Sequence, residues 1–140
     1  MRELKFRVWS EEDKEYRTDC KLRYLFTSPT GLPSTAYNDE GDRFDIEQYT
    51  GLKDKNGKEI YEGDILREKW FDEDVRRGEN RVGKVEYFTD GFVCWFVGGR
   101  FIPLGMFPVS HIEVIGNIHK NPELLDEKEE KHGLIDRTGL

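Results

Sequence analysis

The stretch QYTGLKDKNGKEIYEGDIL, residues 48–66, contains two turn signals between short runs of strand-forming residues. Asn56-Gly57 is typical of a two-residue type I′ hairpin turn, because both residue types tolerate a positive φ angle. In Gly63-Asp64, the aspartate is expected to hold a second tight turn through its side chain. The stretch therefore predicts a hairpin, followed by a turn that leads into a new strand.

Part of this stretch, DKNG, also matches the middle of an EF-hand calcium loop. With Gly57 at the sixth position of that pattern, the first and twelfth positions fall on Leu52 and Gly63. Neither residue has a side-chain oxygen that could bind the ion. Calcium binding by this route is excluded.

Strand signals recur along the rest of the chain at intervals of about 8–12 residues, the spacing of small barrels and sandwiches. Residues 4–9 alternate in strand period, and 16–26 are compatible with a returning strand. Residues 27–45 are rich in Pro, Gly, Ser, Asn and Asp, which predicts an extended loop or a boundary between two parts of the protein. A mixed-charge loop is expected over 68–81, and a two-residue hairpin turn at Asp90-Gly91.

Helix signals are confined to the end of the chain. Asn121 is a good N-cap residue, Pro122 suits the first helical position, and Glu123 complements the helix dipole. Gly133 is a plausible C-terminal stop. We therefore expect one short helix over 121–133.

The composition is that of a small, acidic, folded protein, with 140 residues and a net charge of −7. No apolar run approaches the ~20 residues that cross a bilayer. The N-terminal residues lack the apolar segment of a secretion signal, so a cytoplasmic protein is expected. Cys20 and Cys94 form no paired metal or redox spacing, and both are interpreted as reduced, buried residues.

No group of residues has the spacing of a catalytic centre. Glu59, Glu62 and Asp64 are close in sequence, but no nucleophile, phosphate loop or ligand cluster accompanies them. The three histidines, which lack any metal-binding spacing and are expected at the surface, are His111, His119 and His132. We therefore expect a protein without enzymatic activity, metal or other cofactor.

The strand predicted over 92–97 is apolar on both faces. Such a strand needs cover on both sides. Either the N-terminal hairpin packs over it, or one face contacts a partner or another subunit. The candidate partner surface consists of Phe92, Val93, Trp95 and Val97.

Nucleic-acid binding is the alternative, because cations and aromatic side chains occur together between residues 67 and 100. The candidate contacts are Arg67, Lys69, Trp70, Arg76, Arg77, Arg81, Lys84 and Arg100, with Phe71 and Trp95 as further stacking residues. Acidic residues alternate with these cations almost one for one, which weakens attraction to a phosphate backbone.

Three segments together resemble the YopX family of phage and prophage proteins. They are KFRVW (5–9), the central QYTGLKDKNGKEIYEGDIL (48–66) and VIGNIHKNPELL (114–125). The resemblance implies an SH3-like β-barrel in the C-terminal part, with Gly63-Asp64 at the turn into a barrel strand. It also implies an origin in a phage or prophage, and it supplies no catalytic residues.

The sequence and the resemblance together predict a mainly β protein in three parts: an N-terminal hairpin and loop (1–47), an SH3-like barrel (48–120) and a C-terminal helix and tail (121–140). The leading functional hypothesis is a phage-derived, non-enzymatic module that binds a host or phage protein or assembles with itself. The alternative is a nucleic-acid-binding SH3-like barrel. Fold alone cannot decide between them.

Overall fold

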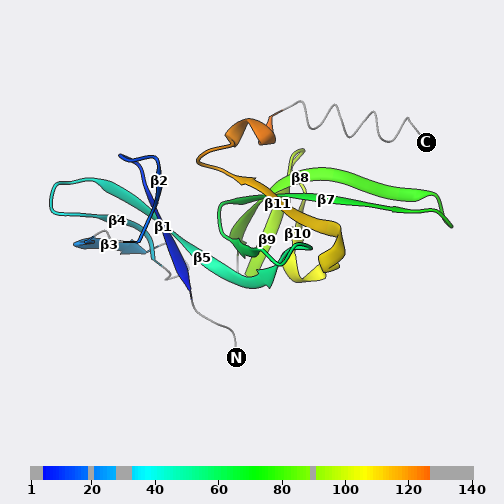
Figure 1. The fold of residues 1–140 in the computed structure, drawn as a ribbon, viewed down its shortest axis with the longest axis horizontal. Coiled ribbons are helices and arrows are strands. Elements are labelled where there is room, and N and C mark those ends of the chain that lie inside the picture. The colour runs from blue at the N-terminus through cyan, green and yellow to red at the C-terminus, as the bar shows by residue number, and fades with distance from the viewer. Residues whose placement is uncertain (1–4, 19–20, 28–32, 89–90, 127–140) are drawn as a thin grey trace.

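The computed structural model describes residues 5–18, 21–27, 33–88 and 91–126. These residues form two antiparallel β-sheets and three short 3₁₀ turns, which confirms the mainly β prediction (Figure 1). No helix in this part of the chain is long and apolar enough to span a membrane.

The N-terminal sheet has the strand order β2-β1-β5-β4-β3. A sixth strand, β6, also pairs with β5. Its strands are β1 (Phe6–Ser10), β2 (Glu15–Arg17), β3 (Tyr24–Thr27), β4 (Pro33–Tyr37), β5 (Arg43–Lys53) and β6 (Glu59–Tyr61). β5 is the long strand that joins the two halves of the molecule. Its first part pairs with β1 and β4, and its last part pairs with β6.

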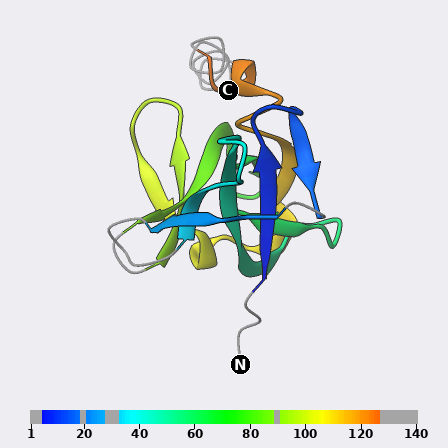
Figure 2. The ribbon, with the colours of Figure 1, turned by 90° about the vertical axis from the view of Figure 1, so that its left-hand side faces the viewer.

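The second sheet has five strands in the order β10-β9-β8-β7-β11. Its strands are β7 (Asp64–Asp72), β8 (Arg77–Phe88), β9 (Gly91–Phe96), β10 (Phe101–Pro103) and β11 (Ile112–Asn117). The 3₁₀ turns are η1 (Leu104–Met106) and η2 (Val109–His111), between β10 and β11, and η3 (Pro122–Leu125), after β11. Viewed from the side of the N-terminal sheet, the strands of that sheet lie in front of the second sheet (Figure 2).

The main apolar core lies on one face of the second sheet. Its members come from β6 to β11 and are Ile60, Leu66, Val85, Phe92, Cys94, Phe96, Leu104 and Ile112. Gly83 lies within this core, where a Cβ would stand 2.7 Å from Cys94 Sγ and 2.5 Å from the carbonyl oxygen of Trp95. Burying a large apolar side chain, such as those of Leu66 and Phe92 in this core, contributes about 1.5–3 kcal/mol to the stability of the folded chain.

Two predicted loops are β-structure instead. Residues 68–81 continue the pairing of β7 with β8 as far as Asp72 and Arg77, and this hairpin extends beyond the body of the sheet (Figure 1). Residues 27–45 contain β4 and the start of β5. Both segments are rich in charged or loop-forming residues, but pairing with neighbouring strands holds them as β-structure, so composition concealed the pairing.

Three finer predictions also need correction. The described strands do not close into the SH3-like barrel expected over 48–120; they form two separate sheets. The predicted helix ends at Leu125, because Asp126 has extended backbone angles, and residues 127–133 lie outside the described part. Asn56 lacks the positive φ that a type I′ turn requires. The Gly57 N–H bonds the Asp54 carbonyl, and Gly57 itself has a φ of +80°.

Candidate functional site

A cluster of buried charges lies where the two sheets meet, and Glu47 of β5 is at its centre. The Glu47 side chain is only 7% exposed. Its Oε1 accepts hydrogen bonds from Arg7 Nε (2.7 Å) and Tyr16 OH (2.9 Å). Its Oε2 lies 2.6 Å from His119 Nε2. One carboxylate thus connects β1, β2, β5 and the segment after β11.

Arg7 extends the cluster to Asp64, at the start of β7. Arg7 Nη2 donates to Asp64 Oδ1 (2.7 Å) and to the carbonyl oxygen of Glu62 (3.2 Å). The guanidinium lies 4.4 Å from the ring centroid of Tyr16 and 4.8 Å from that of Tyr61. Such a planar cation suits stacking and forked hydrogen bonding at one site.

The pKa values of both Arg7 and Asp64 are raised above their usual values. Burial alone would lower the pKa of Arg7, but the carboxylates of Asp64 and Glu47 outweigh it and raise that pKa above its usual value. Burial raises the pKa of Asp64, and the charge of Arg7 opposes this effect. Removing the cation would leave a buried carboxylate without a compensating charge, which is costly.

The Gly63-Asp64 turn brings these groups together. Gly63 has a φ of +86°, and a Cβ at this position would lie 2.5 Å from Glu47 Oε2. Asp64 Oδ2 accepts a hydrogen bond from the Tyr61 N–H (2.8 Å), so its side chain holds the turn. The absence of a side chain at Gly63 leaves space for the Glu47 carboxylate.

Trp9 and His119 form the side of the cluster near the β1–β2 turn. Trp9 is 1% exposed, and the His119 ring stacks on it with 4.4 Å between centroids and 7° between planes. Trp9 Nε1 donates to Glu11 Oε2 at 3.0 Å. The prediction of a surface position is wrong for His119, because its side chain is only 10% exposed. No local spacing marks this histidine, since its partner Glu47 is 72 positions away.

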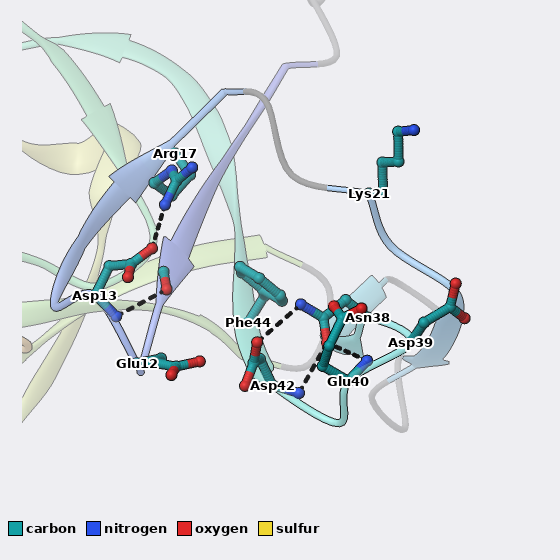
Figure 3. A pocket seen from close by; sticks show the side chains of 10 residues that line it. Glu12, Asp13, Arg17, Lys21, Asn38, Asp39, Glu40, Asp42 and Phe44 are labelled. Atoms are coloured by element: carbon teal, nitrogen blue, oxygen red, sulfur yellow. Dashed lines mark hydrogen bonds and ion pairs between the residues drawn. The ribbon is translucent and has the colours of Figure 1, made fainter.

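A shallow polar pocket lies on the opposite face of the N-terminal sheet, between the β1–β2 and β4–β5 turns (Figure 3). Ser10 and Phe44 form its floor, and most of the charged groups around it are carboxylates. The Asn38 amide group accepts bonds from the Glu40 and Asp42 backbone, so it stabilises the β4–β5 turn. We assign no ligand to this pocket.

The four residues of the candidate partner surface differ in exposure. Phe92 (8% exposed) and Val93 (4%) are buried, so neither can contact a partner in the folded chain. Val97 is half-buried. Trp95 is also half-buried, and its ring centroid lies 4.7 Å from that of Phe101 and 5.5 Å from that of Phe88.

These three rings define what we call the aromatic patch, formed by Phe88, Trp95 and Phe101. Phe88 and Phe101 are each 41% exposed, and their centroids are 5.1 Å apart. Rings from β8 and β10 therefore contact Trp95. The sequence indicated Trp95 but missed its two neighbours, Phe88 and Phe101, which belong to the strands on either side of β9.

The candidate nucleic-acid contacts are divided between two faces of the β7–β8 hairpin. The strand register places Arg77 and Arg81 on one face, and Arg67, Lys69 and Lys84 on the other. Arg76 occupies the hairpin turn with a φ of +53°, and Arg100 is exposed after β9. The structure therefore brings no more than part of this set together.

Several members of the set already have partners within the protein, among them Arg81 and Trp70. Arg81 Nε bonds Glu68 at 2.6 Å and lies over the Phe96 ring. Trp70 donates to Glu68 at 3.1 Å and stacks on His111. Phe71, by contrast, is 50% exposed.

Cys94 is 1% exposed, and burial raises the pKa of its thiol to about 12. This side chain therefore serves as a small apolar core residue, as expected. Cys20 and His132 lie outside the described residues.

Comparisons with known proteins found a family and similar solved structures. A family model described as YopX protein matches residues 5–126. The crystal structure of protein EF1440 from Enterococcus faecalis is similar at 26% identity and a TM-score of 0.53, covering 90% of this chain and all of that one. Protein yopX from Bacillus subtilis is 22% identical with a TM-score of 0.48, covering 86% of this chain and 97% of that one. The comparison with curated proteins gave no match.

Proposed function

The chain belongs to the YopX protein family, and for this member we propose a non-enzymatic role as a module that associates with a second copy of itself through the aromatic patch. The proposed setting is the cytoplasm of a bacterium that carries the phage or prophage. The alternative partner is another host or phage protein that binds the same patch.

The aromatic patch is the observation that carries this proposal. Phe88, Trp95 and Phe101 contact one another on the face of the second sheet opposite the main apolar core, and two of them keep 41% of their surface exposed. Aromatic side chains are enriched at protein interfaces, where they bury much area at low entropic cost. A group of exposed rings on a small protein is a typical contact surface.

The position of the patch suits a symmetric contact. Phe101 belongs to β10, which is the edge strand of the second sheet. Two copies can approach edge to edge about a twofold axis, so that each patch covers the other. Such an isologous contact buries both patches and leaves none exposed for further addition.

The charged cluster supports a structural role more than a catalytic one. Glu47, Arg7 and Asp64 bind one another across the junction of the sheets. A catalytic carboxylate needs access to a substrate, whereas the Glu47 and Asp64 side chains are 7% and 2% exposed.

Sedimentation velocity over a concentration series tests the proposal. Wild-type protein should form a dimer as its concentration rises into the high micromolar range. Trp95→Ser combined with Phe101→Ser should remain monomeric. Met106→Ser is the matched control, because Met106 is apolar and 72% exposed but lies outside the patch; it should dimerise like wild type. A wild-type chain that stays monomeric throughout contradicts self-association.

Nucleic-acid binding through Arg76, Arg77, Lys84 and Arg100 remains the alternative, and the geometry supports it less well. Lys84 pairs with Glu86, and the cations do not form one continuous surface. A gel-shift assay at low salt with single- and double-stranded DNA tests it. Absence of any shift rules it out, whereas binding that is weakened by salt and by Arg76→Ala with Arg77→Ala would support it.

A further inference from the structure

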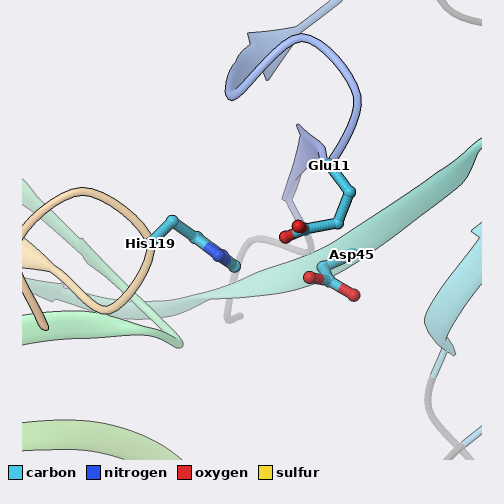
Figure 4. Close-up of side chains that lie close together, drawn as sticks. All are labelled: Glu11, Asp45 and His119. Carbon is cyan, nitrogen blue, oxygen red and sulfur yellow. The ribbon is translucent and has the colours of Figure 1, made fainter.

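We propose that Glu11, Asp45 and His119 bind a divalent transition-metal ion. Glu11 follows β1, Asp45 belongs to β5, and His119 follows β11, so three segments distant in sequence contribute one side chain each (Figure 4). One ligand atom from each side chain lies within 4.8 Å of the other two. This site is independent of the aromatic patch.

His119 is held in a position that suits metal binding. Its side chain is nine-tenths buried, and its ring is stacked on Trp9. Its Nε2 is 2.6 Å from Glu47, while Nδ1 has no hydrogen-bond partner among the described residues. A metal-binding histidine usually donates its other ring N–H to a carboxylate, which fixes the ring and makes the free nitrogen a better ligand. Glu47 provides this carboxylate.

Trp9 also positions the second ligand, because its Nε1 donates to Glu11 Oε2. The competing contacts are with surface cations: Lys14 Nζ lies 2.8 Å from Glu11 Oε1, and Arg43 Nη2 lies 3.1 Å from Asp45 Oδ1. The Lys14 and Arg43 side chains are 69% and 53% exposed, and ion pairs of this kind contribute little. A doubly charged ion can displace them.

The donor set indicates the class of metal. One imidazole and two carboxylates suit Zn²⁺ and its neighbours in the first transition row, and three protein ligands leave one position for water. Tetrahedral ligands at about 2.1 Å from the ion are ~3.4 Å apart. Glu11 and Asp45 would therefore move inward by about 1 Å, which their partly exposed side chains permit.

Such an ion would link the two halves of the molecule. Glu11 and Asp45 belong to the N-terminal sheet and its β1–β2 turn, whereas His119 follows β11 of the second sheet. The ion would therefore reinforce the junction that the charged cluster already forms. Because it binds the folded chain, it should also raise the melting temperature.

Metal titration of the untagged, EDTA-treated full chain tests the proposal, in a Cys20→Ser background that removes a competing thiol. Calorimetry with Zn²⁺ should give one ion per chain, and Co²⁺ should produce visible ligand-field absorption. Asp45→Asn and Glu11→Gln keep the side-chain shapes, and each should weaken Zn²⁺ binding at least tenfold, as should His119→Ala if it folds.

The double variant His111→Ala/His132→Ala is the matched control, because it removes the other imidazoles and leaves the proposed ligands; its affinity should equal that of the parent. Three results would overturn the proposal: no binding by the folded parent chain, binding that survives both Asp45→Asn and Glu11→Gln, or binding lost in the control. Circular dichroism of each variant establishes that it is folded before its Zn²⁺ affinity is compared with that of the parent chain.

Discussion

Gly63 illustrates how a missing side chain permits the charged cluster. Its φ of +86° lies in the left-handed region, which costs other residues about 1 kcal/mol or more. In addition, a Cβ would come within 2.5 Å of Glu47 Oε2, closer than real Cβ contacts. Gly57 has a similar φ of +80°, but a Cβ there meets nothing within 4 Å. A side chain at Gly57 would therefore meet backbone strain alone, whereas one at Gly63 would meet both backbone strain and a steric clash with Glu47.

We predict that Gly63→Ala lowers the free energy of unfolding by about 2–4 kcal/mol, and Gly57→Ala by about 1 kcal/mol. The difference arises because the new methyl group must displace the Glu47 carboxylate from His119. Urea unfolding monitored by circular dichroism measures both values. Equal losses in the two variants would show that Glu47 moves aside without cost.

Glu62 is a residue whose charge opposes folding. Burial raises its pKa, and the charges of Glu47 and Glu86 act in the same direction, against hydrogen bonds from the backbone N–H groups of Gln48 and Tyr87. A raised pKa in the folded state means that stability is lost as the pH rises through that pKa. Ionised Glu62 therefore destabilises the protein at neutral pH.

We predict that Glu62→Gln unfolds at a higher urea concentration than wild type at pH 7. The amide oxygen of glutamine can still accept the Gln48 N–H. The advantage should shrink as the pH falls and disappear well below the usual glutamate pKa of about 4.3, where Glu62 is protonated in both folded and unfolded chains. Glu73→Gln is the control, since Glu73 is exposed in the β7–β8 turn. A pH-independent gain would contradict the electrostatic origin.

Among the elements, β3 is an exposed apolar edge strand. It is the last strand on one side of the N-terminal sheet, and Tyr24, Leu25 and Phe26 are each more than half exposed. Edge strands of this composition tend to pair with other chains, because their outward backbone groups lack partners from the sheet. This edge is separate from the aromatic patch.

We predict that Leu25→Lys reduces aggregation during refolding and leaves the free energy of unfolding within about 0.5 kcal/mol of wild type. A charge on an edge strand opposes pairing between chains. Light scattering after dilution from urea measures the effect. Val109→Lys adds the same charge at another exposed apolar residue and should leave aggregation unchanged. Equal protection by both variants would point to net charge instead.

The elements also show what a sequence can and cannot predict here. Strands with clear alternation or turn signals, such as β1 and β9, were predicted close to their positions. β4 and the outer part of the β7–β8 hairpin, predicted as a loop over 68–81, were missed, because their pairing depends on neighbouring strands and not on their own composition. The charged cluster was missed for the same reason, since Glu47 and His119 meet only after both sheets form.

At the scale of the whole molecule, the three segments that carry the family resemblance converge on the charged cluster. Arg7 comes from 5–9, Asp64 from 48–66 and His119 from 114–125. These segments belong to both sheets and to the connection after β11. The most recognisable parts of the sequence thus form the junction that joins the two halves.

This junction should determine whether the two sheets unfold together. Arg7→Met removes the cation shared by Glu47 and Asp64, and leaving buried carboxylates unpaired costs about 3–5 kcal/mol.

In a Trp70→Phe/Trp95→Phe background, fluorescence of Trp9 reports on the N-terminal sheet, while circular dichroism reports on the whole chain. With Arg7 present, the two urea transitions should coincide. With Arg7→Met, the Trp9 transition should occur at lower urea, because the second sheet keeps its own core while the N-terminal sheet loses its main polar attachment. Coincident transitions at a lower midpoint would mean instead that apolar contacts and the shared strand β5 are sufficient to couple the halves.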